Sequence, residues 1–379
     1  MADLNLACVV GARPNFMKMA PLLRALEAYP HVQAVLVHTG QHYDGKLSDV
    51  FFEELEMRRP DVCLEVGSGK HGEQTARVLE RFEAVLEDGP PGGKRYHRVV
   101  VVGDVNSTMA ATLAAVKLGI PVAHVEAGLR SFDRSMPEEI NRLVTDALSN
   151  LLFVSEPAGM ENLRREGHPP DQLHLTGNVM IDTLMRLLPS AKGRNTLDRY
   201  GLEPGRYGVL TLHRPANVDA PETLSRFLNV LIKASQDLPL VFPVHPRTKQ
   251  RIERFGLSGQ LDAASQIVQL PPLGYLDLLA MTSQARVIVT DSGGLQEEST
   301  ALGIPCLTAR PGTERPITVH EGTSTLVGSD PLKLQQCLRA VLDGTYKQGK
   351  CPALWDGRAA ERIAQLLAVP ASKAKRHAA

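Results

Sequence analysis

Carboxylates stand at three points in the first half of the chain where a bound ligand could reach them. Asp104 and Glu126 each follow an apolar run, and Glu138 opens a helical pattern beside Glu139. Ligands of an open α/β sheet bind outside the carboxyl ends of its strands, and carboxylates placed there can exchange protons with a substrate. Two simpler interpretations stay open: Asp104 could cap the following helix, and a glutamate in a first turn suits the helix dipole.

Two cations follow the first apolar run. The turn Gly11–Lys18 carries Arg13 and Lys18, and it matches neither a dinucleotide fingerprint nor a P-loop. Cations near the start of a helix suit a diphosphate. The alternative is a tight turn with two solvated side chains.

A second strand end, in the other half of the chain, suits a nucleoside diphosphate. Ser292, Gly293 and Gly294 follow an apolar run, with Glu298 one turn further along and Arg315 after the next run. Glycines let backbone N–H groups approach a phosphate at a helix start, and a carboxylate there can bind the hydroxyls of a ribose. A capped helix with a Gly-Gly turn would explain the turn but not the whole group.

Histidines end two further strands of that half. The segment Thr211–Pro215, which carries His213, occupies the place that Gly11–Pro14 occupies in the first half, and His245 ends the next strand. We interpret His124, in contrast, as a core residue. The sequence therefore predicts His213, opposite the three carboxylates, as a participant in the chemistry, with His245 near it.

The elements that must position these residues repeat between the halves. Val99–Thr108 and Val287–Gly294 each predict a buried strand, a polar carboxyl end and a helix that stops at Leu-Gly-Ile-Pro. Alternating strands and helices predict parallel sheets covered on both faces. Strands are expected at 4–10, 31–38, 98–102, 121–125, 151–154, 207–212, 239–244, 266–270, 285–290 and 304–308, and helices at 16–28, 47–55, 72–86 and from Asn178 to Leu188.

The predicted fold class is α/β, with two Rossmann-like, doubly wound parallel-sheet domains that face a central cleft. The polar connector 189–195 separates a domain at 1–188, which holds the carboxylates, from a domain at 189–370 of a type that binds a nucleoside diphosphate. The last helix is a candidate to pack back on the first domain. A frayed tail is expected at 371–379.

Composition excludes several classes of function. The 379 residues include 42 basic and 42 acidic ones, a balance that gives no reason to expect nucleic acid or an anionic membrane as partner. The five cysteines are scattered, which predicts neither a disulfide framework nor a metal site. No apolar run approaches the roughly 18 residues of a membrane span, and the N-terminus lacks a signal pattern. We expect a cytoplasmic protein.

These motifs together resemble the non-hydrolysing UDP-N-acetylglucosamine 2-epimerases. The resemblance spans nearly the whole chain in one order and rests on Gly11–Pro14, Gly40–His42, Gly103–Thr108, His124–Arg130, Pro137–Arg142, Thr176–Asn178, His213–Arg214, Pro243–His245, Thr290–Glu298 and Thr313–Pro316. It implies the GT-B architecture and usually a homodimer. It also implies an activity that interconverts UDP-GlcNAc and UDP-ManNAc through elimination and re-addition of UDP, without a cofactor.

The resemblance also implies roles for individual residues. Asp104, Glu126 and Glu138 would be the acid/base carboxylates, and His213 would assist the departing UDP. Arg13, Lys18, Arg142, Arg315 and the segment Ser292–Gly294 would bind the UDP-sugar, and Glu298 its ribose. Some members bind a second UDP-sugar as an activator, for which Gln41, His42 and His245 are the candidates here.

The chain departs from the family pattern in two places. Pro215 and Ala216 stand where members often carry Arg-Glu after His213-Arg214, and Tyr43 follows the Gln-His pair. The segments Gln41–Tyr43 and Leu129–Met136 also resemble epimerases of UDP-2,3-diacetamido-2,3-dideoxy-glucuronic acid, whose extra carboxylate Arg130 or Arg134 could bind. A hydrolysing 2-epimerase and a GT-B glycosyltransferase are two further enzyme classes that the residues leave open.

Overall fold

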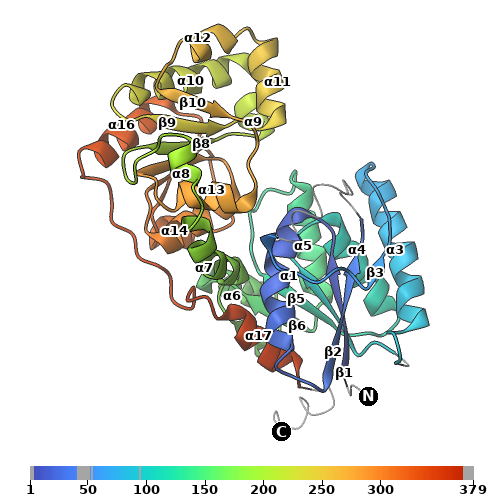
Figure 1. Cartoon of the computed structure of the whole chain (residues 1–379). Coiled ribbons are helices and arrows are strands. Elements are labelled where there is room, and N and C mark those ends of the chain that lie inside the picture. Colours follow the sequence, from blue (N-terminus) through green and yellow to red (C-terminus); the bar gives the residue numbers. More distant parts are fainter. Residues whose placement is uncertain (1–3, 41–51, 53, 94, 370–379) are drawn as a thin grey trace. The chain divides into compact units, whose positions relative to one another are not determined.

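A computed structural model describes residues 4–40, 52, 54–93 and 95–369 (Figure 1). The chain divides into two compact units. The first runs to Thr183 and takes in the segment from Ala353 onward, and the second is Leu184–Pro352. The division falls inside one helix, α7 (Val179–Lys192).

The first unit is built on a seven-stranded parallel sheet with strand order β3-β2-β1-β4-β5-β6-β7. The strand order reverses between β1 and β4, so the loops after these strands flank the switch point where ligands of such sheets bind. The strands are β1 Leu4–Val10, β2 Val32–His38, β3 Val62–Cys63, β4 Arg98–Val102, β5 Val122–Ala127, β6 Leu151–Val154 and β7 Leu173–Leu175.

Helices cover this sheet because its strands are apolar on both faces. Val78 and Phe82 pack with alternate residues of β1 and β4 in one core cluster, which places their helix on one face. Helix α17 lies against α1. The helices are α1 Arg13–Leu26, α3 His71–Asp88, α4 Asn106–Lys117, α5 Pro137–Leu148, α6 Pro157–Arg165, the short 3₁₀ helix Pro170–Gln172, and α17 Ala359–Leu367.

The second unit repeats this plan with a six-stranded parallel sheet, in the order β10-β9-β8-β11-β12-β13. Its strands are β8 Gly208–Thr211, β9 Leu240–Pro243, β10 Ile267–Leu270, β11 Val287–Thr290, β12 Cys306–Thr308 and β13 Ser324–Leu326. Its helices are α8 Thr196–Arg199, α9 Pro215–Val218, α10 Pro221–Ser235, α11 Pro246–Arg254, α12 Ser258–Asp262, α13 Tyr275–Thr282, α14 Gly293–Leu302, α15 Ile317–His320 and α16 Pro331–Leu342.

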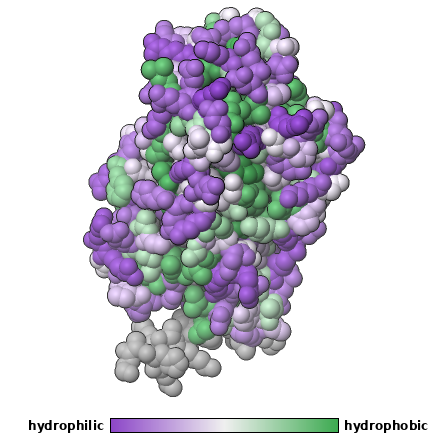
Figure 2. All heavy atoms as spheres, turned by 90° about the vertical axis from the view of Figure 1, so that its left-hand side faces the viewer, coloured by the Kyte–Doolittle hydropathy of each residue, from purple (hydrophilic) through white to green (hydrophobic). Residues whose placement is uncertain are grey.

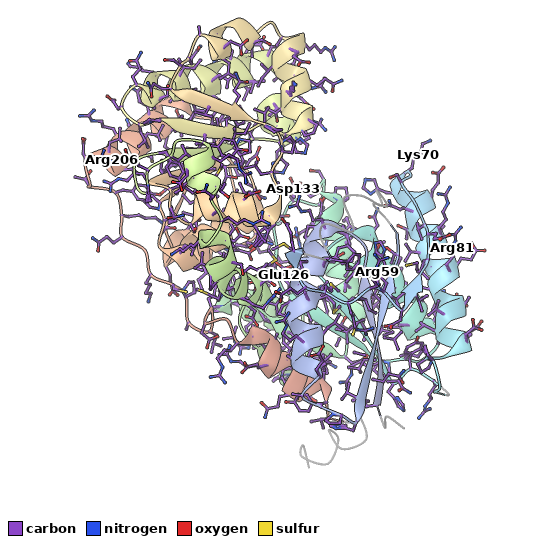
Figure 3. All side chains as sticks on the ribbon, in the orientation of Figure 1. Arg59, Lys70, Arg81, Glu126, Asp133 and Arg206 are labelled. Carbon is purple, nitrogen blue, oxygen red and sulfur yellow. The ribbon has the colours of Figure 1, made fainter. Side chains whose placement is uncertain are left out.

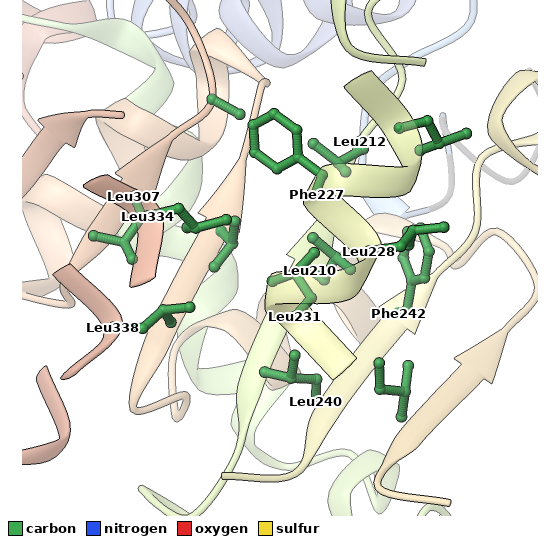
Figure 4. Close-up of a cluster of buried hydrophobic side chains, with 14 of the residues drawn as sticks. Leu210, Leu212, Phe227, Leu228, Leu231, Leu240, Phe242, Leu307, Leu334 and Leu338 are labelled. Atoms are coloured by element: carbon green, nitrogen blue, oxygen red, sulfur yellow. The ribbon is translucent and has the colours of Figure 1, made fainter. Parts of the chain in front are cut away.

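An apolar cluster packs against one face of the sheet of this second unit (Figure 4). Phe227 and Leu231 of α10 pack against Leu210 of β8 and Phe242 of β9, and Leu338 of α16 joins them. The core therefore fixes the strands whose carboxyl ends carry His213 and His245.

The predicted pair of parallel α/β sheets is confirmed, and some details of the prediction are wrong. The polar connector at 189–195 is in part helical, because α7 continues through Pro189 to Lys192. The first helix begins at Arg13 and not at Phe16, with Pro14 in its first turn, where the missing N–H of a proline costs nothing. Three short strands, β3, β7 and β13, were not predicted. The helix expected at 47–55 lies largely outside the described residues.

Hydrophilic residues cover most of the face drawn in Figure 2, with apolar residues scattered between them. None of the helices in the described parts of the chain combines the length and the apolarity that crossing a bilayer requires.

Candidate active site

In the first unit, Asn15 joins the ends of the two strands at the switch point. Its side-chain oxygen Oδ1 accepts hydrogen bonds from the backbone N–H groups of Gly11 and Ala12, each at 3.1 Å. Its side-chain nitrogen Nδ2 donates to the backbone carbonyl of Val102 at 2.9 Å. Because these groups lie just after β1 and at the end of β4, Asn15 holds the Arg13 turn beside the strand that leads to Asp104.

Lys18 and Glu126 form a buried ion pair at this edge, between α1 and the end of β5. Figure 3 labels Glu126 in the first unit. The solvated-cation interpretation is therefore wrong for Lys18, whereas Arg13 is exposed. A side chain on Gly103 would place its Cβ 3.1 Å from the Lys18 ammonium nitrogen and 3.5 Å from a Glu126 carboxylate oxygen. The Gly103 backbone consequently lies directly against the pair.

Helix α5 holds Asp104 by two contacts. Arg142 forms an ion pair with the Asp104 carboxylate, and the Asn141 amide donates to the Asp104 carbonyl at 2.8 Å. The N-cap of α4 is Val105, without a side-chain capping bond. The capping alternative for Asp104 is thus wrong, and its partly exposed carboxylate is fixed by a cation instead.

The neighbouring glutamates at the start of α5 have different surroundings. Glu139 is 2% exposed and accepts hydrogen bonds from the backbone N–H groups of Ser131 and Phe132, both at 2.9 Å, and from Arg142. Burial alone would raise the pKa of Glu139, but these N–H groups and the guanidinium lower it below its ordinary value. Glu138 is exposed. Glu139 therefore holds the loop before α5, and Glu138 presents its carboxylate outward.

The cation suggested for a substrate carboxylate is buried. Arg130 is 3% exposed and forms ion pairs with Asp146 at 2.7 Å and Glu166 at 2.6 Å. Arg130 is therefore neither a surface residue nor presented to a substrate in this structure, whereas Arg134 is exposed. His124 is fully buried and pairs with Asp146, in keeping with the structural role predicted for it.

In the second unit, Asp291 at the end of β11 fixes the orientation of His213. The Asp291 carboxylate accepts the backbone N–H groups of His213 at 3.0 Å and Arg214 at 2.8 Å, and the Asn217 amide at 3.0 Å. It also lies 2.8 Å from Nδ1 of His213. With Nδ1 bound, Nε2 is the ring nitrogen left to face a ligand.

The charge of Asp291 suits this role. Burial alone would raise the pKa of Asp291, but hydrogen bonds from His213, Asn217 and the Arg214 backbone lower it below its ordinary value. Asp291 therefore faces Nδ1 of His213 as a carboxylate, the arrangement in which a carboxylate orients a catalytic histidine.

His245 lies beside His213, with the ring centroids 5.5 Å apart. Its Nδ1 accepts the backbone N–H of Arg247 at 3.2 Å, so that the side chain caps α11. Burial and the neighbouring His213 lower the pKa of His245. The structure thus brings together the two histidines that the sequence singled out.

The N-terminus of α14 lies beside a chain of buried charges. Arg315 contacts Glu314 at 2.6 Å and Glu297 at 2.7 Å, and Arg310 contacts Glu314 at 2.7 Å. A Cβ on Gly293 would lie 3.1 Å from the Arg315 guanidinium. The first turn of the helix and one cation therefore adjoin each other, a combination that suits an anion.

Glu298 lies further along α14, 5% exposed, and accepts a 3.0 Å hydrogen bond from the Tyr275 hydroxyl. A role for Tyr275 was not predicted from the sequence. The only signal was its place in the first turn after the loop that follows β10. Ser292 is the N-cap residue of α14, and its side chain makes no capping bond.

Two predicted residues cannot be placed, and one kind of site is not found. Gln41 and His42, the activator candidates, lie outside the described residues. Within residues 4–40, 52, 54–93 and 95–369, no group of three or more His, Cys, Asp or Glu side chains is arranged to hold a metal ion.

Comparison with known proteins identifies a family. The model of the UDP-N-acetylglucosamine 2-epimerase family matches residues 24–368. The UDP-N-acetylglucosamine 2-epimerase of Methanocaldococcus jannaschii is 40% identical over 369 residues, 96% of this chain and 99% of that one. The crystal structure of that organism's enzyme in complex with UDP-GlcNAc and UDP superposes with a TM-score of 0.85 at 39% identity, over 96% of this chain and 99% of the other.

A relative with a different substrate matches over a similar length. The UDP-2,3-diacetamido-2,3-dideoxy-D-glucuronate 2-epimerase of Pseudomonas aeruginosa is 36% identical over 368 residues, 96% of this chain and 99% of that one.

Proposed function

The chain belongs to the UDP-N-acetylglucosamine 2-epimerase family, and from that premise we propose that it interconverts UDP-GlcNAc and UDP-ManNAc by inverting C2 of the sugar. The observation that carries the proposal is the match over nearly the full length to epimerases of that substrate, combined with carboxylates at the carboxyl edge of the first sheet.

The reaction proceeds by elimination and re-addition. A carboxylate removes the C2 proton, the C2–H electron pair forms a C1=C2 double bond, and the C1–O bond breaks with its electrons on the β-phosphate of UDP. A proton is then delivered to C2 from the opposite face, and UDP adds back to C1. The three carboxylates Asp104, Glu126 and Glu138 are the candidates for these two proton transfers.

Neighbouring cations hold two of these carboxylates in place. Arg142 pairs with Asp104, and Lys18 pairs with Glu126. Glu138 is exposed on the first turn of α5. Two of the three candidates are therefore held by ion pairs, and the third is accessible from solvent.

The second unit supplies the contacts to the nucleotide. The first turn of α14 and Arg315 stabilise the diphosphate, whose charge increases as the C1–O bond breaks. Glu298 accepts hydrogen bonds from the ribose hydroxyls. His213, oriented by Asp291, donates through Nε2 to the departing phosphate oxygen. Arg13, exposed at the start of α1, is a further cation for the diphosphate.

The experiment is incubation of the protein with UDP-GlcNAc in D2O, followed by proton NMR. UDP-ManNAc with deuterium at C2 is the expected product. Free ManNAc together with UDP would overturn the proposal in favour of a hydrolysing enzyme, in which water captures the intermediate. An inert UDP-GlcNAc, with and without added nucleotide sugar as activator, would overturn the choice of substrate.

The second candidate substrate is UDP-2,3-diacetamido-2,3-dideoxy-glucuronic acid, favoured by the similarity to the Pseudomonas aeruginosa enzyme. The extra carboxylate of this sugar requires a cation. Arg130, one of the two arginines suggested for it, forms ion pairs with Asp146 and Glu166 instead. The same NMR assay with this sugar distinguishes the two substrates.

We also propose a homodimer, for which light scattering should give about twice the chain mass of 41.2 kDa.

A further inference from the structure

A fully buried histidine of β5, His124, connects helix α5 with the loop after β4, close to Asp104 and Glu126. The Nδ1 atom of His124 on β5 lies 2.6 Å from Asp146 of α5, and its Nε2 atom lies 2.8 Å from the carbonyl oxygen of Gly103. His124 and Asp146 are both 0% exposed. Because each ring nitrogen lies within hydrogen-bond distance of an acceptor on a different element, the ring is held in one orientation.

The same aspartate holds the other side of Glu126. The second carboxylate oxygen of Asp146 accepts the backbone N–H of Gly128 at 3.0 Å and contacts Arg130 at 2.7 Å. Asp146 therefore contacts His124, two residues before Glu126, and Gly128, two residues after it.

Glu126 needs this support because its backbone is strained. Its φ angle is 73°, in the left-handed region that non-glycine residues seldom adopt. The pairing of β5 with β6 shifts in register between Val125 and Ala127, as at a bulge that redirects a side chain. Such strain persists only where surrounding contacts fix it. Asp146 supplies those contacts from a neighbouring helix.

The bond to Gly103 extends the support to the second carboxylate. Gly103 precedes Asp104 directly, and its own N–H donates to the Val125 carbonyl at 3.1 Å. Gly103 also lies against the Lys18–Glu126 pair. A shift of the Gly103 peptide would consequently move Asp104 and disturb Glu126 together.

We propose that Asp146 and His124 are positioning residues that fix the spacing between the Asp104 and Glu126 carboxylates. Being fully buried, they act through these carboxylates and not on the sugar. This inference rests on the proposed function, because the spacing matters only if both carboxylates serve the proton transfers at C2.

Asp146→Asn tests the role, because the amide keeps the size of the side chain and removes its charge. The expected result is a kcat lowered by about 100-fold, the order that a displacement of roughly 1 Å costs, with deuterium exchange at C2 lowered in parallel. The KM for the UDP-sugar and the Kd for UDP should stay within about threefold, since Asp146 contacts His124, Gly128 and Arg130 and none of the residues proposed to bind the nucleotide.

Asp182→Asn is the matched control. Asp182 is a buried aspartate of the same unit that accepts the backbone N–H groups of Ala359 at 3.1 Å and Ala360 at 2.6 Å, and so anchors α17. We expect this variant to lower Tm and to keep kcat within about twofold. A general loosening of the unit would lower kcat in both variants at equal loss of Tm.

His124→Gln is the second variant, which loses the bridge while Asp146 keeps its charge. A folded Asp146→Asn or His124→Gln protein with kcat within threefold of wild type would overturn the proposal. So would a kcat loss no greater than that of Asp182→Asn at equal Tm, or failure of both variants to fold, which would make the pair a folding requirement. If the wild type itself exchanges no deuterium, the proposed function fails instead, and the positioning role fails with it.

Discussion

Glu138 and Glu139 show how two adjacent residues of one type can have different surroundings, with Glu139 in a structural role and Glu138 the one proposed for the chemistry. Glu139 accepts two backbone N–H groups and pairs with Arg142, whereas Glu138 is exposed. The helix dipole explains one glutamate in this first turn, but the sequence does not tell which of the two. The difference follows from the direction in which each side chain leaves the first turn of α5.

Replacing each glutamate by glutamine should therefore have opposite consequences. Glu138→Gln should lower kcat by about 100-fold or more, the usual contribution of a general acid or base, with little change in Tm. Glu139→Gln should lower the free energy of unfolding by about 1–3 kcal/mol, because Arg142 and the loop N–H groups lose a charged acceptor. Steady-state kinetics and urea unfolding measure the two effects. Full activity of folded Glu138→Gln would remove Glu138 from the mechanism.

Asp291 is expected to act only through His213, and a double mutant can show it. Asp291→Asn should lower kcat by about 100-fold or more, since a wrongly oriented histidine cannot donate to the leaving phosphate. If the two residues act as a unit, adding Asp291→Asn to His213→Gln should cost little beyond the single His213→Gln change. Fully multiplicative losses in kcat would mean that Asp291 acts independently.

At the scale of elements, long apolar runs flanked by glycine were predictable and short or strained segments were not. Strands such as Arg98–Val102 matched their predicted bounds, because a buried parallel strand needs a continuous apolar run. Strands β3 and β13 have two and three residues, too few to show a pattern. Pro189 indicated a break, yet the helix passes through it. The amino-acid sequence around Glu126 does not indicate the bulge in β5, because that bulge depends on contacts from α5.

The candidate site was predictable in the same degree. Asp104, Glu126, His213 and Glu298 were predicted as candidates because each follows or adjoins a strand end, the place where parallel sheets bind ligands. Their partners were not found, since Asp146, Asp291 and Tyr275 reach them from other elements of the same unit. Pairing across a fold depends on packing, which one sequence does not display.

The docking of α17 should depend on pH. Burial raises the pKa of Asp182 to about 6, above its ordinary 3.8, despite the N–H groups it accepts from the start of α17. A raised pKa means that the folded chain binds more protons than the unfolded chain between these two values. The contribution of Asp182 to stability should therefore decrease as the pH rises from about 4 to 6, by at most about 3 kcal/mol.

Asp182→Asn removes this dependence, so the difference in unfolding free energy between wild type and variant should fall over that window and stay constant above it. Trp355, the sole tryptophan, lies in the same C-terminal segment as α17. Its buried indole N–H donates to the Ser155 carbonyl at 3.0 Å. Unfolding exposes the indole, so tryptophan fluorescence reports the transition. A difference that is independent of pH would contradict the raised pKa.

At the scale of the whole molecule, each unit carries its own sheet, its own core and its own group of residues proposed to function in the reaction. The first holds the carboxylates and their cations, and the second holds His213, the start of α14 and Glu298. The chain passes from one unit to the other within α7 and returns near Ala353. This separation implies that proton transfer and nucleotide binding can be impaired independently.

A pair of charge-neutralising variants, one in each unit, tests that separation. Asp104→Asn should lower kcat by about 100-fold or more and leave the Kd for UDP within about threefold, because Arg142 keeps its contact with Glu139 and the unit stays folded. Glu298→Gln keeps an acceptor for Tyr275 but loses its charge toward the ribose, so UDP should bind about 10-fold or more weakly. At a UDP concentration of about 100 times the wild-type Kd, ligand binding stabilises the folded protein by about 2.7 kcal/mol. The resulting rise in Tm should persist in Asp104→Asn and shrink in Glu298→Gln. Loss of that rise in Asp104→Asn would mean that the first unit also determines nucleotide affinity, and the proposed division of roles between the units would be wrong.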